Sequence, residues 1–245
     1  GAPKGYSAPR LTTSMLRTDW PGYLVSHFAH ATDSTACAPS AVETYRRVLS
    51  RQPDGSVTIC TLGFFSNLKA LLASGPDRWS KLSGKDLVAK KVKLLVSMAG
   101  AFPNGYEFNV YWDADAARTV ADEWPTPIIF SGWEIGSEIF TGNAVRDLPG
   151  DISANPIKAA YTLALSEDDR PHGRDSWDQT AALVAIRGAA PWFTLRHGHM
   201  TVDGKGNNKW TDDPQGQHAY LVFAQPIKQV RDAIEALMTQ MPRKR

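Results

Sequence analysis

Glu107 and Asn109 stand two residues apart, a short distance after an apolar run that ends at Met98. Residues spaced by two in an extended backbone point to the same side. A carboxylate and an amide on one side of a chain can bind neighbouring hydroxyl groups of a sugar. The pattern Glu-x-Asn is common, so a solvated loop edge is the alternative interpretation of these two residues.

Trp177 and Asp178 open a segment whose helical spacing runs to Arg187. Asp178 could simply cap this helix, with Trp177 as the apolar residue that packs beside the cap. The functional interpretation makes Asp178 an oxygen ligand for a cation and Trp177 a flat surface for a planar ligand. The residues alone leave both interpretations open.

Two histidine pairs could also bind a metal ion. His27 and His30 are three apart, and His197 and His199 are two apart. No nearby residue completes a tetrahedral ligand set for either pair, so a metal role is the weaker hypothesis.

The two cysteines, Cys37 and Cys60, cannot build a disulfide framework or a usual zinc site. Their apolar neighbours predict that both are buried, inert thiols. The nucleophile-elbow, phosphate-loop, dinucleotide-binding and zinc-protease motifs do not occur in the sequence. The acidic pairs at 168–169 and 212–213 lie in turn-like contexts and are expected at the surface.

The elements that must position these residues are apolar runs alternating with helical segments. Strands are predicted at 57–62, 92–98 and 127–131, and helices at 38–49, 66–74, 82–91, 113–124, 155–165 and 178–187. Continuous apolar strands between helices predict an α/β fold, with a mostly parallel, Rossmann-like sheet covered by helices on both faces. Ligands bind beyond the carboxyl ends of such strands, where Glu107 and Asn109 would lie.

The two ends of the chain differ from this middle part. Residues 1–36 are loop-rich, with at most short helical pieces, and this length of loop suggests that it serves a site. At the other end, strands at 192–202 and 218–223 are predicted to form a hairpin through a Gly- and Asn-rich turn at 203–216, and a last helix follows Pro226. No linker interrupts the chain, so one domain is expected over residues 1–245.

Composition excludes some partners. The 245 residues carry a net charge of +2 with 21% charged side chains, which gives no reason to expect nucleic acid or an anionic membrane as partner. No apolar run approaches the ~18 residues of a membrane-spanning helix. Neither the cysteines nor the charge indicates a compartment.

Four segments of the chain, in order, resemble the inosine–uridine-preferring nucleoside hydrolase family, over roughly residues 57–190. They are Thr58–Leu68 (the family's strand and G-P-L-T-N turn), Met98–Gly100 (M-G-G), Glu107–Ala117 (E-F-N … D-P-E-A-A) and Phe130–Glu134 (a strand and G-L-D loop). The resemblance implies the nucleoside hydrolase fold and calcium-dependent hydrolysis of the N-glycosidic bond of a ribonucleoside. It also implies a homo-oligomer.

The resemblance assigns roles to particular residues. Glu107 and Asn109 would bind ribose hydroxyls, and Asn104 the 5′-hydroxyl. Asp178 would ligate Ca²⁺ together with a backbone carbonyl of Cys60–Leu62, with Thr61 the expected position. Trp177 stands where many members have a histidine, and the purine-preferring branch is similar in having Trp there. A purine base as leaving group, stacked on Trp177, is therefore expected.

One feature of the family is missing. Its opening Asp-rich strand end, D-x-D-x-x-x-D-D, which supplies calcium ligands and the general base, does not occur in residues 1–245. Residues 1–3 resemble the segment after the family's second strand, so the first strand, first helix and second strand are expected to be absent. A separate or cleaved partner segment is the favoured source of them, and a truncated chain is the alternative. The alternatives are a nucleoside- or sugar-binding pseudoenzyme and an unrelated α/β sugar enzyme.

Overall fold

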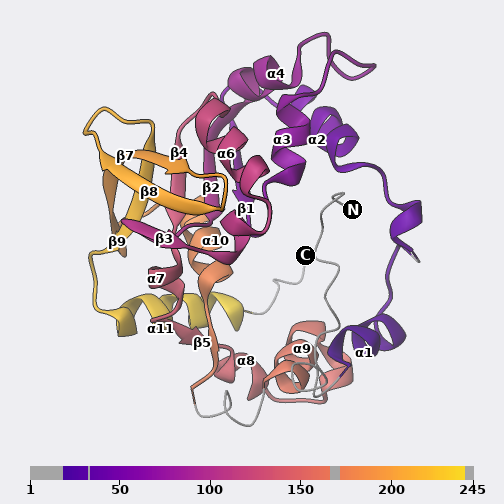
Figure 1. Ribbon diagram of the computed structural model, residues 1–245. Helices are drawn as coiled ribbons and strands as arrows, with labels where there is room; N and C mark the ends of the chain where they lie inside the picture. Colours follow the sequence, from indigo (N-terminus) through magenta and orange to yellow (C-terminus); the bar gives the residue numbers. More distant parts are fainter. Residues whose placement is uncertain (1–18, 33, 166–171, 241–245) are drawn as a thin grey trace. The chain divides into compact units, whose positions relative to one another are not determined.

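A computed structural model describes residues 19–32, 34–165 and 172–240 (Figure 1). The described residues fall into two compact units. The first unit holds residues 39–137 and 177–225, and the second holds 19–32, 34–38, 138–165, 172–176 and 226–240. The expectation of one domain over 1–245 stays a prediction.

A seven-stranded sheet forms the centre of the first unit, with strand order β1-β2-β4-β9-β7-β8-β3. Its strands are β1 (Val57–Thr61), β2 (Val92–Met98), β3 (Asn104–Tyr106), β4 (Ile128–Ser131), β7 (Phe193–Val202), β8 (Asn207–Asp212) and β9 (His218–Phe223). The strands β1, β2, β4 and β9 run parallel, and β7, β8 and β3 add antiparallel pairs. The predicted α/β fold is confirmed.

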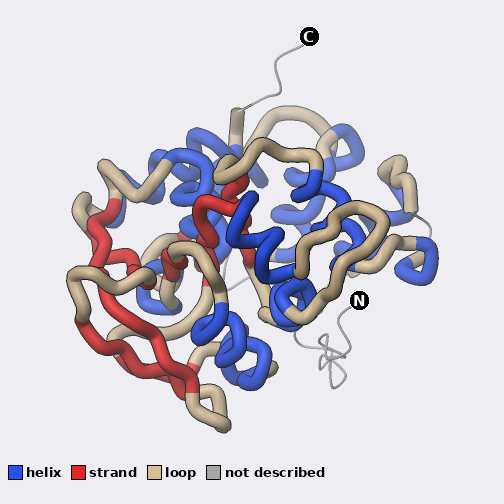
Figure 2. Tube along the Cα trace, turned by 90° about the horizontal axis from the view of Figure 1, so that it is seen from above, coloured by secondary structure: helices blue, strands red, loops and turns tan. Residues whose placement is uncertain are grey.

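Helices cover both faces of this sheet (Figures 1 and 2). The helices α2 (Ala41–Ser50), α3 (Ser66–Leu72), α4 (Gly84–Lys91) and α6 (Ala114–Glu123) share one apolar core with strand residues such as Leu95 and Phe130. On the other face α10 (Trp177–Arg187) packs against β1, β2 and β4. There the Ser131 and Thr180 hydroxyls lie 2.7 Å apart and are hydrogen-bonded. Adjacent residues Phe130 and Ser131 therefore face opposite layers, as a strand requires.

Side-chain caps explain where several of these helices begin. Ser40, Ser83 and Asp113 each accept a hydrogen bond from the backbone N–H three residues ahead, at the first turns of α2, α4 and α6. Such caps satisfy N–H groups that have no partner within the helix. These three helices begin within three residues of their predicted starts. Two further short helices, α5 (Phe108–Tyr111) and α7 (Trp133–Gly136), follow β3 and β4.

The predicted turn at 203–216 was wrong, because it contains the strand β8. The predicted antiparallel pairing of β7 with β9 is confirmed. The inserted strand β8 pairs with β7 on one side and with β3 on the other, and β9 also pairs in parallel with β4. The Gly and Asn residues of this segment obscure a strand that buries Asn208. Tertiary pairing overrides low strand propensity at such positions.

The prediction of two buried cysteines was also wrong. Cys37 is exposed at the end of a short 3₁₀ helix, η1 (Thr35–Cys37), and Cys60 is only partly buried. Cys60 lies in β1, an edge strand that pairs with β2 alone among the described strands. Apolar neighbours in sequence therefore did not place either thiol inside the core.

The second unit consists of short elements: α1 (Trp20–His27), β5 (Phe140–Thr141), α8 (Asn143–Arg146), η2 (Ile152–Ala154), α9 (Pro156–Ala164), β6 (Arg174–Asp175) and α11 (Ile227–Met238). α9 packs against α1 and α8, and α11 packs against β5. Of the loop-rich lead-in at 1–36, residues 1–18 lie outside the described residues, as do Asp168 and Asp169. None of the described helices combines the length and the apolar character needed to cross a membrane.

Candidate functional site

The carboxyl ends of β1, β2 and β4 lie together at one edge of the sheet. Thr61 pairs with Ser97, and Met98 pairs with Ser131, in a parallel register. The segments that follow these three strands therefore begin side by side, which is where open parallel sheets bind ligands. Glu107 and Asn109 come from the segment after β2, as the sequence predicted.

The segment Gly100–Phe102 follows β2 at this edge of the sheet. Its backbone N–H groups are held by three side chains from three parts of the chain: Gly100 donates to Glu107, Ala101 to Asn208 and Phe102 to Glu134, each at 3.0 Å. Gly100 has φ of +82°, a left-handed conformation that favours glycine. The segment is thus fixed before any ligand arrives.

Glu107 is buried, and both of its carboxylate oxygens are engaged. Oε2 accepts from the Gly100 N–H at 3.0 Å, and Oε1 accepts from the Asn109 N–H at 2.9 Å as the cap of α5. Each oxygen retains further lone-pair capacity for a ligand hydroxyl. Burial raises the pKa of Glu107, hydrogen bonds to the backbone lower it, and the nearby Asp178 charge raises it again.

Asn109 is also buried, beside the end of β2. Its Nδ2 donates to the Met98 carbonyl at 3.0 Å and lies 3.2 Å from the Met98 sulfur. This bond orients the amide at the strand end. The structure therefore brings Glu107 and Asn109 together through backbone contacts, although α5 begins at Phe108 and the two do not share an extended strand.

Asp178 lies close to this pair. Burial is the main cause of the raised pKa of Glu107 and of the Cys60 thiol, and the Asp178 charge raises both a little further. Partial desolvation raises the pKa of Asp178 itself, although its side chain keeps contact with water. α10 begins at Trp177, so Asp178 lies within the first helical turn. Asp178 is therefore not the helix cap that the alternative interpretation of the sequence expected.

Trp177 is fixed against α7. Its indole N–H donates to the Trp133 carbonyl at 3.0 Å, and a Cβ at Gly136 would come within 2.4 Å of the Trp177 Cα and Cδ1 atoms. Glycine at 136 is therefore what lets the two helices approach. Trp133 is 52% exposed next to Trp177, and its own backbone N–H donates to the Gly100 carbonyl.

Two other predicted site residues have different surroundings. Thr61 ends β1 at the sheet edge, next to the Cys60 and Asp178 pair. Asn104 lies in β3, at the opposite end of the strand order, where its Oδ1 accepts from the Trp210 backbone N–H at 3.3 Å. Within the described part of the chain, Asn104 therefore belongs to the β3–β8 pair, and the predicted contact with the 5′-hydroxyl stays a prediction.

The remaining histidine candidates make local contacts. His27 stacks on Tyr23 and bonds to Ser26. His199 pairs with Asp213 at 3.0 Å, and Asp212 pairs with Arg196, both at the surface as expected for this acidic pair. His30 bonds the Phe28 carbonyl.

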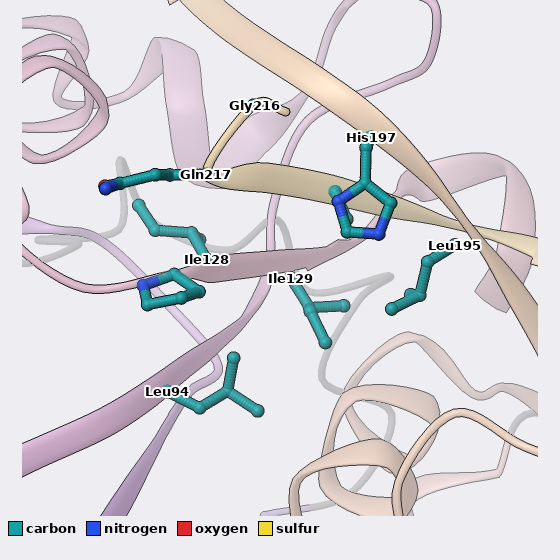
Figure 3. Close-up of a pocket in the computed structure, with 9 residues that line it drawn as sticks. Leu94, Ile128, Ile129, Leu195, His197, Gly216 and Gln217 are labelled. Carbon is teal, nitrogen blue, oxygen red and sulfur yellow. The ribbon is translucent and has the colours of Figure 1, made fainter. Parts of the chain in front are cut away.

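His197 lines a pocket on the face of the sheet, over β2, β4 and β7, with Leu94, Ile129 and Leu195 (Figure 3). The lining that the described residues provide is largely apolar and contains no acidic side chain. Its described lining therefore has no carboxylate to hold a cation. The pocket is formed by strand residues and by Pro127, Gly216 and Gln217, which precede β4 and β9, and not by the segments that follow β1, β2 and β4.

The described residues do not by themselves fit a calcium ion. Among them, no three His, Cys, Asp or Glu side chains gather closely enough to hold a metal. Ca²⁺ takes six to eight oxygen ligands. Asp178 and carbonyl oxygens near Thr61 supply too few, and the acidic charges of Glu107 and Asp178 disfavour each other without further compensation.

Sequence reasoning missed three contributors to this site. Asn208 bonds Ala101 in both directions, and no sequence signal connects two residues 107 positions apart. In the sequence, Glu134 belongs only to the loop after a predicted strand. In the structure its Oε2 accepts from the Phe102 N–H, and burial raises the pKa of its carboxyl group. Its other oxygen, Oε1, has no hydrogen-bond partner among the described residues. Trp133 adjoins Trp177, and its exposure could not be anticipated from the strand before it.

Comparisons of the sequence and of the fold with known proteins point to one family. The inosine-uridine preferring nucleoside hydrolase family model matches residues 19–225. An uncharacterized protein of Schizosaccharomyces pombe is 27% identical over 146 residues, covering 55% of this chain and 43% of that protein. The chain thus spans less than half the length of this curated relative.

Two solved structures share the fold at lower identity. A plant nucleoside hydrolase superposes with a TM-score of 0.62 at 18% identity, covering 86% of this chain and 70% of its own. A purine-preferring ribonucleoside hydrolase from Gardnerella vaginalis gives 0.67 at 16% identity, covering 85% and 68%. With a family model that matches most of its length, the chain belongs to the inosine-uridine preferring nucleoside hydrolase family.

Proposed function

We propose that this chain supplies the nucleoside-binding part of an N-ribosyl hydrolase. The observation that carries the proposal is the buried pair Glu107 and Asn109, which backbone contacts hold beside the carboxyl end of β2. The charge of Asp178, from α10, acts on Glu107. Family membership makes a ribonucleoside the expected ligand of this edge.

In the proposed complex Glu107 accepts hydrogen bonds from ribose hydroxyls. Its carboxylate is already held by two backbone N–H groups, so little side-chain freedom is lost when a ligand binds. Because the group is also buried, a hydroxyl bonded to it competes with little water. Asn109 provides a neighbouring amide at the same strand end.

Hydrolysis of the glycosidic bond needs further groups. The bond between ribose and base breaks with its electron pair leaving on the base, which takes up a proton from solvent. A water molecule adds to the ribose and gives up a proton. Trp177, tied to α7, is proposed to lie against the departing base, and a purine is the preferred ring. The carboxylates that would hold calcium and accept the proton are proposed to come from a segment or chain beyond the described residues.

A second candidate is nucleoside binding without hydrolysis. It is favoured by the absence, within the described residues, of any three clustered metal-ligating side chains. The two candidates predict the same ligand but a different fate for it, so one pair of measurements separates them.

The test combines calorimetric titration of inosine with chromatographic detection of free hypoxanthine. Loss of inosine binding in Glu107→Ala supports the site. Glu123→Ala is the control and should bind inosine normally, because Glu123 is an exposed carboxylate that pairs with Lys85. Release of base with calcium and a carboxylate-bearing partner segment supports the hydrolase. Binding without any release supports the second candidate, and no binding overturns both.

A further inference from the structure

The short helix α7 and the segment Gly100–Phe102 are joined by two hydrogen bonds. The backbone N–H of Trp133 donates to the Gly100 carbonyl at 2.8 Å, and Oε2 of Glu134 accepts from the Phe102 N–H at 3.0 Å. One of these bonds lies at each end of the segment. The first two residues of α7 therefore hold the segment on both sides of its middle residue.

The Gly100 end of this segment also carries a bond to the Glu107 carboxylate. The Gly100 N–H donates to Oε2 of Glu107 at 3.0 Å, and the Asn109 N–H holds the other oxygen. Because a peptide group is planar, the direction of an N–H bond follows the backbone to which it belongs. A shift of the segment would therefore turn this donor, and with it the buried carboxylate that the donor holds.

The Glu134 side chain reaches Phe102 because residue 132 is glycine. A Cβ at Gly132 would lie 2.3 Å from Oε1 and 2.6 Å from Oε2 of Glu134. The carboxylate thus occupies the space that any side chain at 132 would fill. Gly132 has φ of −75° and ψ of 168°, a conformation that residues of other types also adopt. Room for the carboxylate, rather than backbone freedom, is what glycine provides here.

The environment of the Glu134 carboxylate does not favour folding by itself. Oε1 has no hydrogen-bond partner among the described residues, and burial raises the pKa of the group. Burying a carboxylate oxygen without a partner is unfavourable, so a group of this kind calls for an explanation outside stability. The bond from Oε2 to the segment beside Glu107 supplies one.

The same helix also holds Trp177, the residue proposed to lie against the base. The Trp177 indole N–H donates to the Trp133 carbonyl at 3.0 Å. Trp133 therefore links the two sides of the site, since its carbonyl binds Trp177 and its N–H binds Gly100. α7 is thus the element that sets the ribose side of the site relative to the base side.

We infer that Glu134 is a positioning residue for the ribose site. By holding the Phe102 end of the segment, it keeps the Gly100 N–H directed at Glu107 and the Glu107 carboxylate directed at the ribose hydroxyls. The inference rests on the proposed function, and it adds a residue that acts through the backbone rather than on the ligand. Such support matters because a binding group must be held within about 0.5 Å of its productive position.

The experiment measures binding of inosine and of 2′,3′-dideoxyinosine to the 245-residue chain and its variants by calorimetry. The two nucleosides share a base and differ in the ribose hydroxyls, so the ratio of their affinities reports how well Glu107 is placed. Glu134→Leu removes the acceptor for the Phe102 N–H, whereas Glu134→Gln keeps an acceptor oxygen. Glu123→Leu is the matched control, because Glu123 is an exposed carboxylate of α6.

We expect Glu134→Leu to weaken inosine binding about fivefold and to leave dideoxyinosine binding unchanged. Gly132→Ala should have the same effect, because its methyl group displaces the Glu134 carboxylate. Glu134→Gln and Glu123→Leu should bind both nucleosides like the unaltered chain. Unchanged dideoxyinosine binding also reports that each variant is folded at the site.

Amide hydrogen exchange gives a second readout that needs no ligand. The Gly100 N–H should exchange faster in Glu134→Leu and in Gly132→Ala than in the unaltered chain, and Glu134→Gln should restore its protection. The amides of β2 should exchange as before in every variant. This comparison separates a local loosening of the segment from a loss of global stability.

Several results would overturn the inference. If Glu134→Leu keeps the preference for inosine, or leaves the exchange of Gly100 unchanged, Glu107 is placed without Glu134 and only this inference fails. If both nucleosides bind more weakly by the same factor, Glu134 supports the fold and not the ribose site. If the unaltered chain binds both nucleosides equally, or binds neither, the proposed function fails and takes this inference with it.

Discussion

Lowering the pH should destabilise the fold through a single buried histidine, His218. Its ring lies in the first unit, where Nδ1 accepts from the Met200 backbone N–H at 3.1 Å. Burial, with a smaller contribution from the nearby His199, lowers the pKa of His218 from 6.5 to about 4, although a hydrogen bond with the Ala121 backbone opposes the shift. The folded protein therefore holds this ring neutral in a range where the unfolded chain protonates it.

The sign and size follow from proton linkage. Because the folded pKa lies below the unfolded one, the contribution of His218 is complete above about pH 6.5 and is lost as the pH falls toward 4. The shift from 6.5 to about 4 corresponds to about 3 kcal/mol in the free energy of unfolding. At pH 5 about 2 kcal/mol of this should already be lost.

Denaturant unfolding of the unaltered chain and of His218→Gln at pH 7, 5.5 and 4.5 isolates the effect. Glutamine can still accept the Met200 N–H but does not titrate. As the pH falls, the unaltered chain should lose free energy of unfolding relative to the His218→Gln variant. A difference independent of pH, or a His218 ring that titrates near 6.5 by NMR in the folded protein, would refute the reasoning.

Three further predictions concern other parts of the first unit. Arg46 is only 2% exposed and is held by Asp77, Ser74 and the backbone carbonyls of Ser80 and Leu82. Arg46→Met should therefore lower the free energy of unfolding by about 3–5 kcal/mol in urea titrations. A loss under about 1 kcal/mol would contradict this. Gly136→Ala places a methyl group 2.4 Å from Trp177, so it should alter the fluorescence of Trp177 and weaken adenosine binding. An unchanged spectrum would show that α7 moves away to accommodate the methyl group. Asp178→Asn should lower the pKa of Glu107 in carboxyl NMR titrations without returning it to the ordinary value, because burial is the larger cause. An unchanged pKa of Glu107 would show that the Asp178 charge does not act on it.

The fold could be predicted from the sequence where local signals agree. The run 92–98 is β2 without any change of bounds, and Asp113, which the sequence placed in the D-P-E-A-A helix, is the cap of α6. Strong apolar runs and caps act over a few residues, so they are visible in the chain itself. β8 was missed because its stability comes from partners on both sides rather than from its own residue types.

The candidate site was predictable only in part, for a related reason. Glu107 and Asn109 were found because they are close in sequence. Asn208 and Glu134, which hold the segment Gly100–Phe102 from β8 and α7, reach it through tertiary contacts that spacing cannot show.

The most direct test of the account compares the binding of inosine and 2′,3′-dideoxyinosine to the 245-residue chain. The two share a base and differ only in the hydroxyls proposed to contact Glu107 and Asn109. The account predicts that inosine binds at least about tenfold more tightly, and that Glu107→Ala removes this difference. Equal affinities, or a preference that survives Glu107→Ala, would contradict the proposed site.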